Sequence, residues 1–253
     1  MSKTYFISGG NRGIGFSLVR EISGHSSNTV VATARDINTA TELKKWSEAH
    51  SNVKIVQLDV SSAESVKKAA AETERILPEG LDVLISNAGI ANPNNSTLES
   101  SDELFLEHFN VNTLGPIRLI RALKPLLDKK SSKEIAVVSS IAGSVTITMP
   151  LSVSAYGVSK AAINYLIRQL DREMSPEGYS VVLIHPGMVS SDMGNKALEK
   201  MDAEFLKQVL ETMNITVITP DESASGINKN ILHDLKTKHS GKFLSYDGSE
   251  APW

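Results

Sequence analysis

A tyrosine and a lysine with helical spacing are the residues in this chain best suited to acid–base chemistry. Tyr156 and Lys160 are four positions apart within 155–174, whose pattern predicts a helix, so their side chains share one face. A tyrosine with a pKa of about 10 is a poor acid at neutral pH, but a neighbouring ammonium group lowers that pKa. The pair predicts proton transfer, although the same spacing also suits an ordinary surface pair.

Other polar residues could assist this pair. Ser139 and Ser140 close a predicted strand, and a hydroxyl group there can hydrogen-bond a substrate carbonyl. Asn112 lies among apolar neighbours in a predicted helix over 103–127. A polar side chain in that setting bends or caps a helix, and it can also hold a water molecule in a proton relay.

A glycine-rich turn follows the first predicted strand and leads into a predicted helix over 13–23. Its glycines allow the backbone to approach a pyrophosphate, and the helix N-terminus offers free N–H groups. Glycines that serve only the turn are the alternative. The predicted cofactor contacts here are Gly9, Asn11, Arg12, Gly13, Ile14 and Gly15.

The choice between NAD and NADP depends on the end of the second predicted strand. Arg35 lies 20 residues after Gly15, and Arg12 sits inside the glycine turn. Two guanidinium groups near a 2′-phosphate favour NADP(H), whereas Asp36 is a competing signal for NAD(H).

The ends of the third and fourth predicted strands add cofactor contacts. Asp59, followed by Val60, can accept a hydrogen bond from an adenine amino group or cap the next helix, and both roles can hold together. The small residues of Asn87-Ala88-Gly89 let the backbone pass close to a cofactor.

The elements that must position these residues alternate between short apolar strands and amphipathic helices. This pattern predicts a doubly wound, mostly parallel α/β sheet in one domain over 1–253. Strands are predicted at 4–8, 29–34, 54–58, 83–86, 135–139, 180–184 and 242–245. An insertion over 194–219 has helical spacing and predicts either ordinary helix packing or a substrate lid over the carboxyl edge of the sheet.

The composition bounds the function. The chain has 253 residues, a formal net charge of −3 and no cysteine. Nucleic acid and membrane partners are therefore not expected, and disulfides and thiolate chemistry are excluded. The histidines lack ligand spacing, so no metal is assigned. Neither a signal peptide nor a membrane span is recognised, and a cytoplasmic location is expected.

Together these motifs resemble the short-chain dehydrogenase/reductase family over essentially the whole chain. The resemblance implies a Rossmann-type sheet of about seven strands and a catalytic tetrad of Asn112, Ser140, Tyr156 and Lys160. In such a tetrad Tyr156 donates a proton, while Lys160 lowers the tyrosine pKa and bonds the nicotinamide ribose. Ser140 polarises the carbonyl group, and Asn112 carries the relay water.

Two positions depart from the family pattern. The catalytic serine is usually about 13 residues before the tyrosine, which is Gly143 here. The strand-end pattern matches better at Ser140, so we choose Ser140, with Ser139 as the alternative. Ser191 stands where threonine is common, and its hydroxyl group could still bind the carboxamide or phosphate. The contacts implied in this segment are Pro186, Gly187, Val189 and Ser191.

The segments 185–194 and 246–253 are similar to one branch, the sniffer-like and C-factor-like carbonyl reductases. This similarity implies NADPH-dependent reduction of a ketone, aldehyde or diketone. A small hydrophobic carbonyl substrate is expected in a pocket formed by Ser140, Met149, Leu151, Met188 and Met193.

Several alternatives stay open at the level of the sequence. They are a ketoacyl-thioester reductase, a steroid or alcohol dehydrogenase, and a non-catalytic NADP-sensing protein. An epimerase or dehydratase would need further catalytic acids or bases. The resemblance also implies a homodimer or homotetramer, formed through the helices over 103–127 and 155–174.

Overall fold

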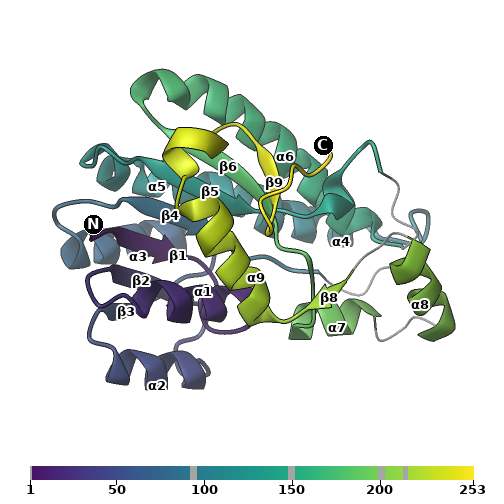
Figure 1. The fold of residues 1–253 in the computed structure, drawn as a ribbon, viewed down its shortest axis with the longest axis horizontal. Coiled ribbons are helices and arrows are strands. Elements are labelled where there is room, and N and C mark those ends of the chain that lie inside the picture. The colour runs from purple at the N-terminus through teal and green to yellow at the C-terminus, as the bar shows by residue number, and fades with distance from the viewer. Residues whose placement is uncertain (1, 92–95, 148–151, 199–202, 213–215) are drawn as a thin grey trace.

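The computed structural model of the chain describes residues 2–91, 96–147, 152–198, 203–212 and 216–253. Its centre is a seven-stranded parallel sheet in the order β3-β2-β1-β4-β5-β6-β9 (Figure 1). The predicted doubly wound α/β class is confirmed. The strands are β1 (Thr4–Ile7), β2 (Thr29–Ala34), β3 (Val53–Gln57), β4 (Val83–Ser86), β5 (Glu134–Val138), β6 (Ser180–His185) and β9 (Phe243–Ser245).

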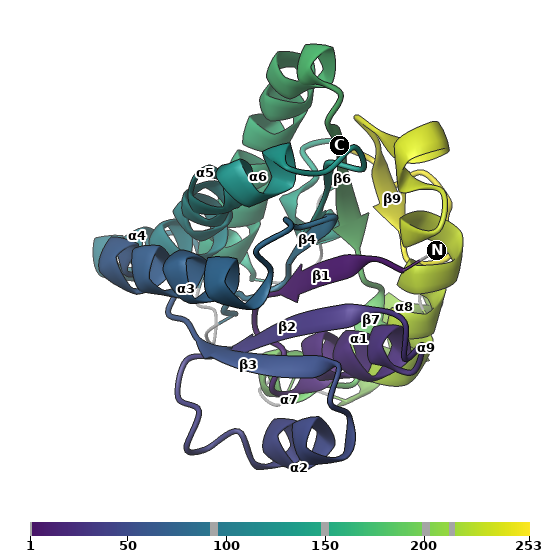
Figure 2. The same ribbon diagram turned by 90° about the vertical axis from the view of Figure 1, so that its left-hand side faces the viewer.

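Helices cover both faces of this sheet, which explains why its strands are apolar with little alternation. Every residue of β4 and β5 is buried. One face packs against α3 (Ala63–Ile76), α5 (Gly115–Asp128) and α6 (Ser154–Met174) (Figure 2). The other face packs against α1 (Gly13–Ser23), α2 (Thr41–Ala49) and α9 (Pro220–Ile227).

The strand order reverses between β1 and β4, because β2 and β3 extend the sheet on one side and β5, β6 and β9 on the other. Ligands of doubly wound sheets bind beyond the carboxyl ends of the strands at such a switch point. The glycine turn after β1 and the segment after β4 therefore meet where a cofactor can bind.

The predicted helix over 103–127 is divided into three parts. It consists of α4 (Asp102–His108), a π-helical turn (Phe109–Leu114) and α5. The wide turn directs two consecutive buried side chains toward α6: Asn112 bonds to Ser159 Oγ, and Thr113 Oγ1 donates to the Ser159 carbonyl oxygen. Single π-turns of this kind are frequent at functional sites.

The predicted insertion over 194–219 overlaps α7 (Asp192–Leu198), which begins two residues earlier, and contains α8 (Ala203–Thr212). The two-stranded sheet of β7 (Met188–Val189) and β8 (Val217–Ile218) is not predicted by the sequence pattern, because strands of two residues have no recognisable period. The helix α9 was also not predicted, although Thr219 and Glu222 form a capping box around Pro220. Within the described residues, no helix is long and apolar enough to cross a membrane.

Candidate active site

The glycine turn after β1 has the backbone shape that a pyrophosphate requires. Gly9 and Gly13 have φ values of +68° and +54°, which favour glycine. A Cβ atom on Gly15 would overlap the Gly9 carbonyl oxygen and lie 2.5 Å from Asn87 Nδ2. No side-chain hydrogen bond caps the N-terminus of α1 at Arg12. These residues fit a dinucleotide: the glycines leave room for it, and the helix N-terminus offers N–H donors.

Side chains directly after β1 and β4 hold this turn in place. Asn87 Nδ2 donates to the carbonyl oxygens of Ser8 (3.0 Å) and Gly9 (3.2 Å). Ser8 Oγ in turn accepts from the backbone N–H groups of Asn87 (2.9 Å) and Ala88 (3.0 Å). Asn87 thus fixes the turn, a role that the sequence did not reveal. Ala88 also limits the space at Gly9, where a Cβ atom would lie 3.0 Å from the Ala88 Cα atom.

The segment after β6 reaches the same turn. Ser191 Cβ lies 3.6 Å from the position of a Cβ atom on Gly13. Arg12 Nη1 is 3.6 Å from Asp192 Oδ2, and both of these side chains are largely exposed. The other predicted contacts shape the path of the backbone: Gly187 has a φ of +87°, the Pro186 carbonyl oxygen accepts from Ser223 Oγ, and Val189 is buried.

The end of β2 presents Arg35 to solvent. Among the described residues, the Arg35 guanidinium group makes no ion pair. Asp36 Oδ1 instead accepts from the backbone N–H of Asn38 at 2.8 Å, so the competing carboxylate is engaged in a local turn. At the end of β3, Asp59 Oδ1 accepts from Ser61 N (2.9 Å) and Ser61 Oγ (2.6 Å).

The helix after β3 is capped by a serine, so the capping role that the sequence allowed for Asp59 is not used. Ser62, not Asp59, accepts from the first turn of α3, through Ser65 N at 3.2 Å. Val60 packs against Gly115, where an added Cβ atom would lie 3.1 Å from Val60 Cβ. Asp59 therefore lies beyond the carboxyl end of β3 and is not needed as the helix cap.

Ser140 and Tyr156 lie together. A side-chain hydrogen bond from Ser140 lowers the pKa of Tyr156, although burial has the larger effect and the net pKa is raised. Ser139 lies elsewhere: its Oγ donates to Asn164 Oδ1 at 2.5 Å in the buried interface with α6. Of the two candidate serines, only Ser140 therefore faces the tyrosine.

Gly143 cannot substitute for this serine. A Cβ atom there would lie 2.5 Å from the Lys160 carbonyl carbon and 2.6 Å from Ala161 N. The short 3-10 helix Ile141–Gly143 thus packs directly on the backbone of α6. The position that the family spacing indicates has no room for any side chain.

Lys160 is a buried cation. Its Nζ donates to the Val138 carbonyl oxygen at 2.9 Å and lies 5.7 Å from the centroid of the Tyr156 ring. Burial lowers the pKa of Lys160 from 10.5 to about 8. The expected lowering of the tyrosine pKa by Lys160 is not found in this structure, because desolvation dominates at Tyr156 and the ammonium group is directed to Val138.

Asn112 fixes the segment that follows β4. Its Nδ2 donates to the Ile90 carbonyl oxygen (2.9 Å) and to Ser159 Oγ (3.0 Å), while its Oδ1 accepts from Ile90 N (2.8 Å). A Cβ atom on Gly89 would lie 3.0 Å from Asn112 Oδ1 and 3.9 Å from Lys160 Nζ. Asn112 and Lys160 therefore border the same space above Gly89.

Comparison with known proteins identifies the family. Residues 3–202 match the short chain dehydrogenase family. The chain belongs to that family. This short-chain dehydrogenase is 41% identical over 252 residues to an uncharacterised oxidoreductase of Schizosaccharomyces pombe, with 100% of this chain and 98% of that protein covered. An uncharacterised oxidoreductase of Saccharomyces cerevisiae is 39% identical, with coverage of 98% and 96%.

Solved structures give the same assignment. The short-chain dehydrogenase is similar to the NADPH-bound carbonyl reductase from chicken fatty liver (TM-score 0.85, 31% identity, 100% of this chain and 99% of that chain). It is also similar to the carbonyl reductase Sniffer of D. melanogaster (TM-score 0.84, 26% identity, 100% of both chains). The chain is thus an oxidoreductase of a family that uses NAD or NADP.

Two residues of the predicted substrate pocket of this short-chain dehydrogenase lie in described elements, and the pocket itself stays a prediction. Met188 is half-buried in β7, and Met193 is 37% exposed in α7. Met149 and Leu151 lie outside the described residues. His108 was missed: its ring packs edge-on against Tyr156 with centroids 6.5 Å apart. Its position four residues before Asn112 is a signal that could have found it.

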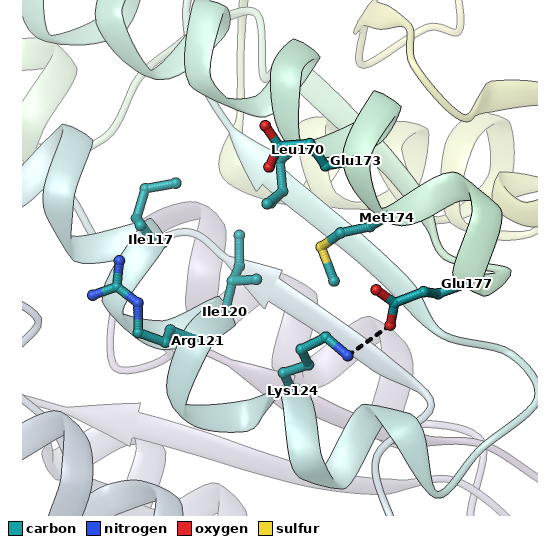
Figure 3. Close-up of a pocket in the computed structure, with 8 residues that line it drawn as sticks. All are labelled: Ile117, Ile120, Arg121, Lys124, Leu170, Glu173, Met174 and Glu177. Atoms are coloured by element: carbon teal, nitrogen blue, oxygen red, sulfur yellow. Dashed lines mark hydrogen bonds and ion pairs between the residues drawn. The ribbon is translucent and has the colours of Figure 1, made fainter.

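A separate groove of about 290 Å³ lies between α5 and α6 of the short-chain dehydrogenase (Figure 3). Ile120 and Met174 lie within it, and Lys124 and Glu177 form an ion pair at its rim. The groove does not include the tetrad residues. Self-association through these helices stays a prediction.

Proposed function

We propose that this short-chain dehydrogenase reduces a small hydrophobic ketone, aldehyde or diketone with NADPH. The observation that carries the proposal is the contact of Ser140 with Tyr156 beside a buried lysine, all at the carboxyl edge of the sheet. The similarity to two carbonyl reductases supports the same substrate class.

The proposed preference for NADP(H) rests on two arginine side chains, one within the glycine turn and one at the end of β2. Arg35 is exposed at the end of β2, and Arg12 lies within the turn. A phosphate group can accept bidentate hydrogen bonds from a guanidinium group, whereas a 2′-hydroxyl group gains less from two positive charges. Asp36, which would favour NAD(H), is engaged with Asn38.

Each polar residue of the tetrad has one task in the reduction. A bound reduced nicotinamide supplies the hydride to the carbonyl carbon. Ser140 Oγ donates a hydrogen bond to the carbonyl oxygen and polarises it. Tyr156 Oη gives its proton to that oxygen, and its raised pKa keeps the proton on the hydroxyl group until negative charge develops.

Lys160 and Asn112 support that proton transfer. The ammonium group of Lys160 would hold the nicotinamide ribose of a bound cofactor and would stabilise the tyrosinate left after the transfer. Asn112 orders the segment around Ile90, and in this proposal it would also carry the water that returns a proton. The buried position of both residues keeps bulk water away from the reacting groups.

The test is a comparison of NADPH and NADH consumption with simple diketones, aldehydes, acyl thioesters and steroid ketones. We expect the highest kcat/KM with a diketone or aldehyde and NADPH. A preference for an acyl thioester or a steroid would favour the corresponding alternative enzyme. Cofactor binding without turnover of any of them would favour the NADP-sensing alternative.

A further inference from the structure

The last residues of the chain fold back onto the loop that carries Ser140. After β9 the backbone reverses its direction. Ser245 N donates to the Ser249 carbonyl oxygen at 2.8 Å, and Ala251 N donates to the Phe243 carbonyl oxygen at 2.8 Å. An antiparallel bridge joins Leu244 to Glu250. In Figure 1 this end of the chain passes β9 and ends near the region before α6.

One oxygen atom at the end of this segment accepts an unusual number of hydrogen bonds. The Trp253 carbonyl oxygen accepts from the backbone N–H groups of Val145 (3.0 Å) and Thr146 (3.2 Å). It also accepts from Ser144 Oγ (2.7 Å) and Thr146 Oγ1 (3.0 Å). These contacts join parts of the chain that are 107 to 109 residues apart.

The Trp253 side chain anchors the other side of the contact. Its ring lies 5.7 Å from the Phe243 ring in β9, and the Arg168 guanidinium group of α6 lies 5.0 Å from its centroid. This is a cation–π interaction, and tryptophan is the aromatic side chain that forms the strongest one. Trp253 thus connects an edge strand and α6 to the loop after Ser140.

That loop is also held from the opposite side. Gly143 packs on the Lys160 backbone, and a Cβ atom on Gly157 would lie 2.7 Å from the Ala142 carbonyl oxygen. The stretch 141–146 is therefore confined between α6 and Trp253. It links Ser140 to the rest of the connection that leads to Tyr156.

We propose that residues 251–253 form a clamp that positions the stretch 141–146, directly after Ser140, and so determines selectivity for the carbonyl substrate. Trp253 acts here as a positioning residue, since its contacts are with the loop and its neighbours. This inference rests on the proposed function for the substrate class. The mechanical link between Trp253 and the loop can be measured without turnover.

The first measurement is hydrogen exchange of the backbone amides over 141–147 in the full chain. We expect Trp253→Ala to increase exchange at Val145 and Thr146 about tenfold or more, because the ring contacts that hold the accepting oxygen are lost. Trp253→Phe retains an aromatic ring for Phe243 and Arg168 and should restore slow exchange. Val145→Ala is the matched control: that side chain is 84% exposed, and the variant keeps the backbone donor.

The second measurement separates positioning from catalysis. In Trp253→Ala we expect the KM for a bulky ketone to rise about tenfold, as befits the loss of one or two weak contacts. The KM for NADPH should stay within about twofold, because the glycine turn does not contact the clamp. The double variant Ser144→Ala/Thr146→Val removes hydroxyl donors without altering the tryptophan and should act in the same direction.

The outcomes are distinguishable. Unchanged loop exchange in folded Trp253→Ala and in the double variant would overturn the clamp. An equal rise in KM for NADPH and ketone would also overturn it, since the effect would then be general destabilisation. If no carbonyl compound is reduced by wild-type protein, the proposed function fails, whereas altered loop exchange would still establish the link between Trp253 and the loop.

Discussion

The cations of the cofactor side and of the reaction centre lie in opposite environments. The Arg12 side chain is 67% exposed, whereas Lys160 as a residue is only 6% exposed. Water screens the guanidinium group, so its pair with Asp192 contributes little to stability. Burial instead destabilises the charged form of Lys160 and lowers its pKa to about 8.

This difference separates two kinds of site. On the cofactor side, glycines and Asn87 determine the shape of the backbone. The exposed guanidinium groups there can bind an anionic ligand. At the reaction centre, burial has the largest effect on the pKa values of Tyr156 and Lys160, and hydrogen bonds orient the side chains. Substitutions on the cofactor side should therefore change binding, and those at the reaction centre should change turnover or its pH dependence.

The largest expected effect is at Tyr156. Tyr156→Phe removes the hydroxyl group and should lower kcat for diketone reduction by about 10³-fold, within the range for loss of general acid catalysis. Binding of NADPH, followed by fluorescence titration, should stay unchanged. Retained turnover would show that Tyr156 is not the proton donor. It would also contradict the expectation that substitutions at the reaction centre, unlike those on the cofactor side, change turnover.

The next effect distinguishes the two serines. Ser140→Ala should lower kcat by about 10²-fold, because it removes a donor to the developing oxyanion. Ser139→Ala should leave kcat within a few fold but lower the free energy of unfolding by about 1–3 kcal/mol, because it leaves Asn164 Oδ1 without its buried donor. Kinetics and chemical denaturation measure the two effects. The reverse result would exchange the roles of the two serines.

A smaller effect is expected on the cofactor side. Arg35→Ala should raise the KM for NADPH about 10- to 100-fold through loss of a charge-assisted hydrogen bond, and should leave the KM for NADH nearly unchanged. Steady-state kinetics with both cofactors measure this. Arg12→Ala should act in the same direction but less strongly, because Arg12 already pairs with Asp192. A wild-type preference for NADH would contradict the assignment.

The smallest effect is the pH dependence from Lys160. Since its pKa is about 8, kcat/KM for reduction should fall about tenfold between pH 7 and pH 9 as the ammonium group loses its proton. Lys160→Arg stays charged and should shift this fall to higher pH. A pH profile for wild type that is flat up to pH 9 would show that the charge is not needed.

The same pKa shift predicts a change in stability. The folded pKa of about 8 lies below the ordinary value of 10.5, so between these values the unfolded chain binds the proton more tightly. The free energy of unfolding of wild type, relative to Lys160→Met, should therefore rise from pH 8 to pH 10.5. Urea titrations at several pH values measure this difference.

The sequence by itself determined the features that depend on local pattern. Buried strands such as 29–34 and the helix 13–23 were predicted with the bounds that the structure has, because apolar runs and glycine turns act over a few residues. The glycine turn and the spacing of Tyr156 and Lys160 are local for the same reason. The role of Asp59 was less certain, since its carboxylate suits a helix cap as well as a cofactor contact, and in the structure Ser62 is the cap.

The tertiary structure decided how distant segments meet. Ser139 and Ser140 are equivalent in sequence, but in the extended backbone after β5 Ser139 contacts Asn164 of α6, while Ser140 contacts Tyr156. Gly143 is excluded only by the backbone of α6, and Trp253 meets Ser144 across 109 residues. The pKa of Lys160 likewise follows from burial. Desolvation and contacts between elements depend on the whole packed fold, which no local pattern contains.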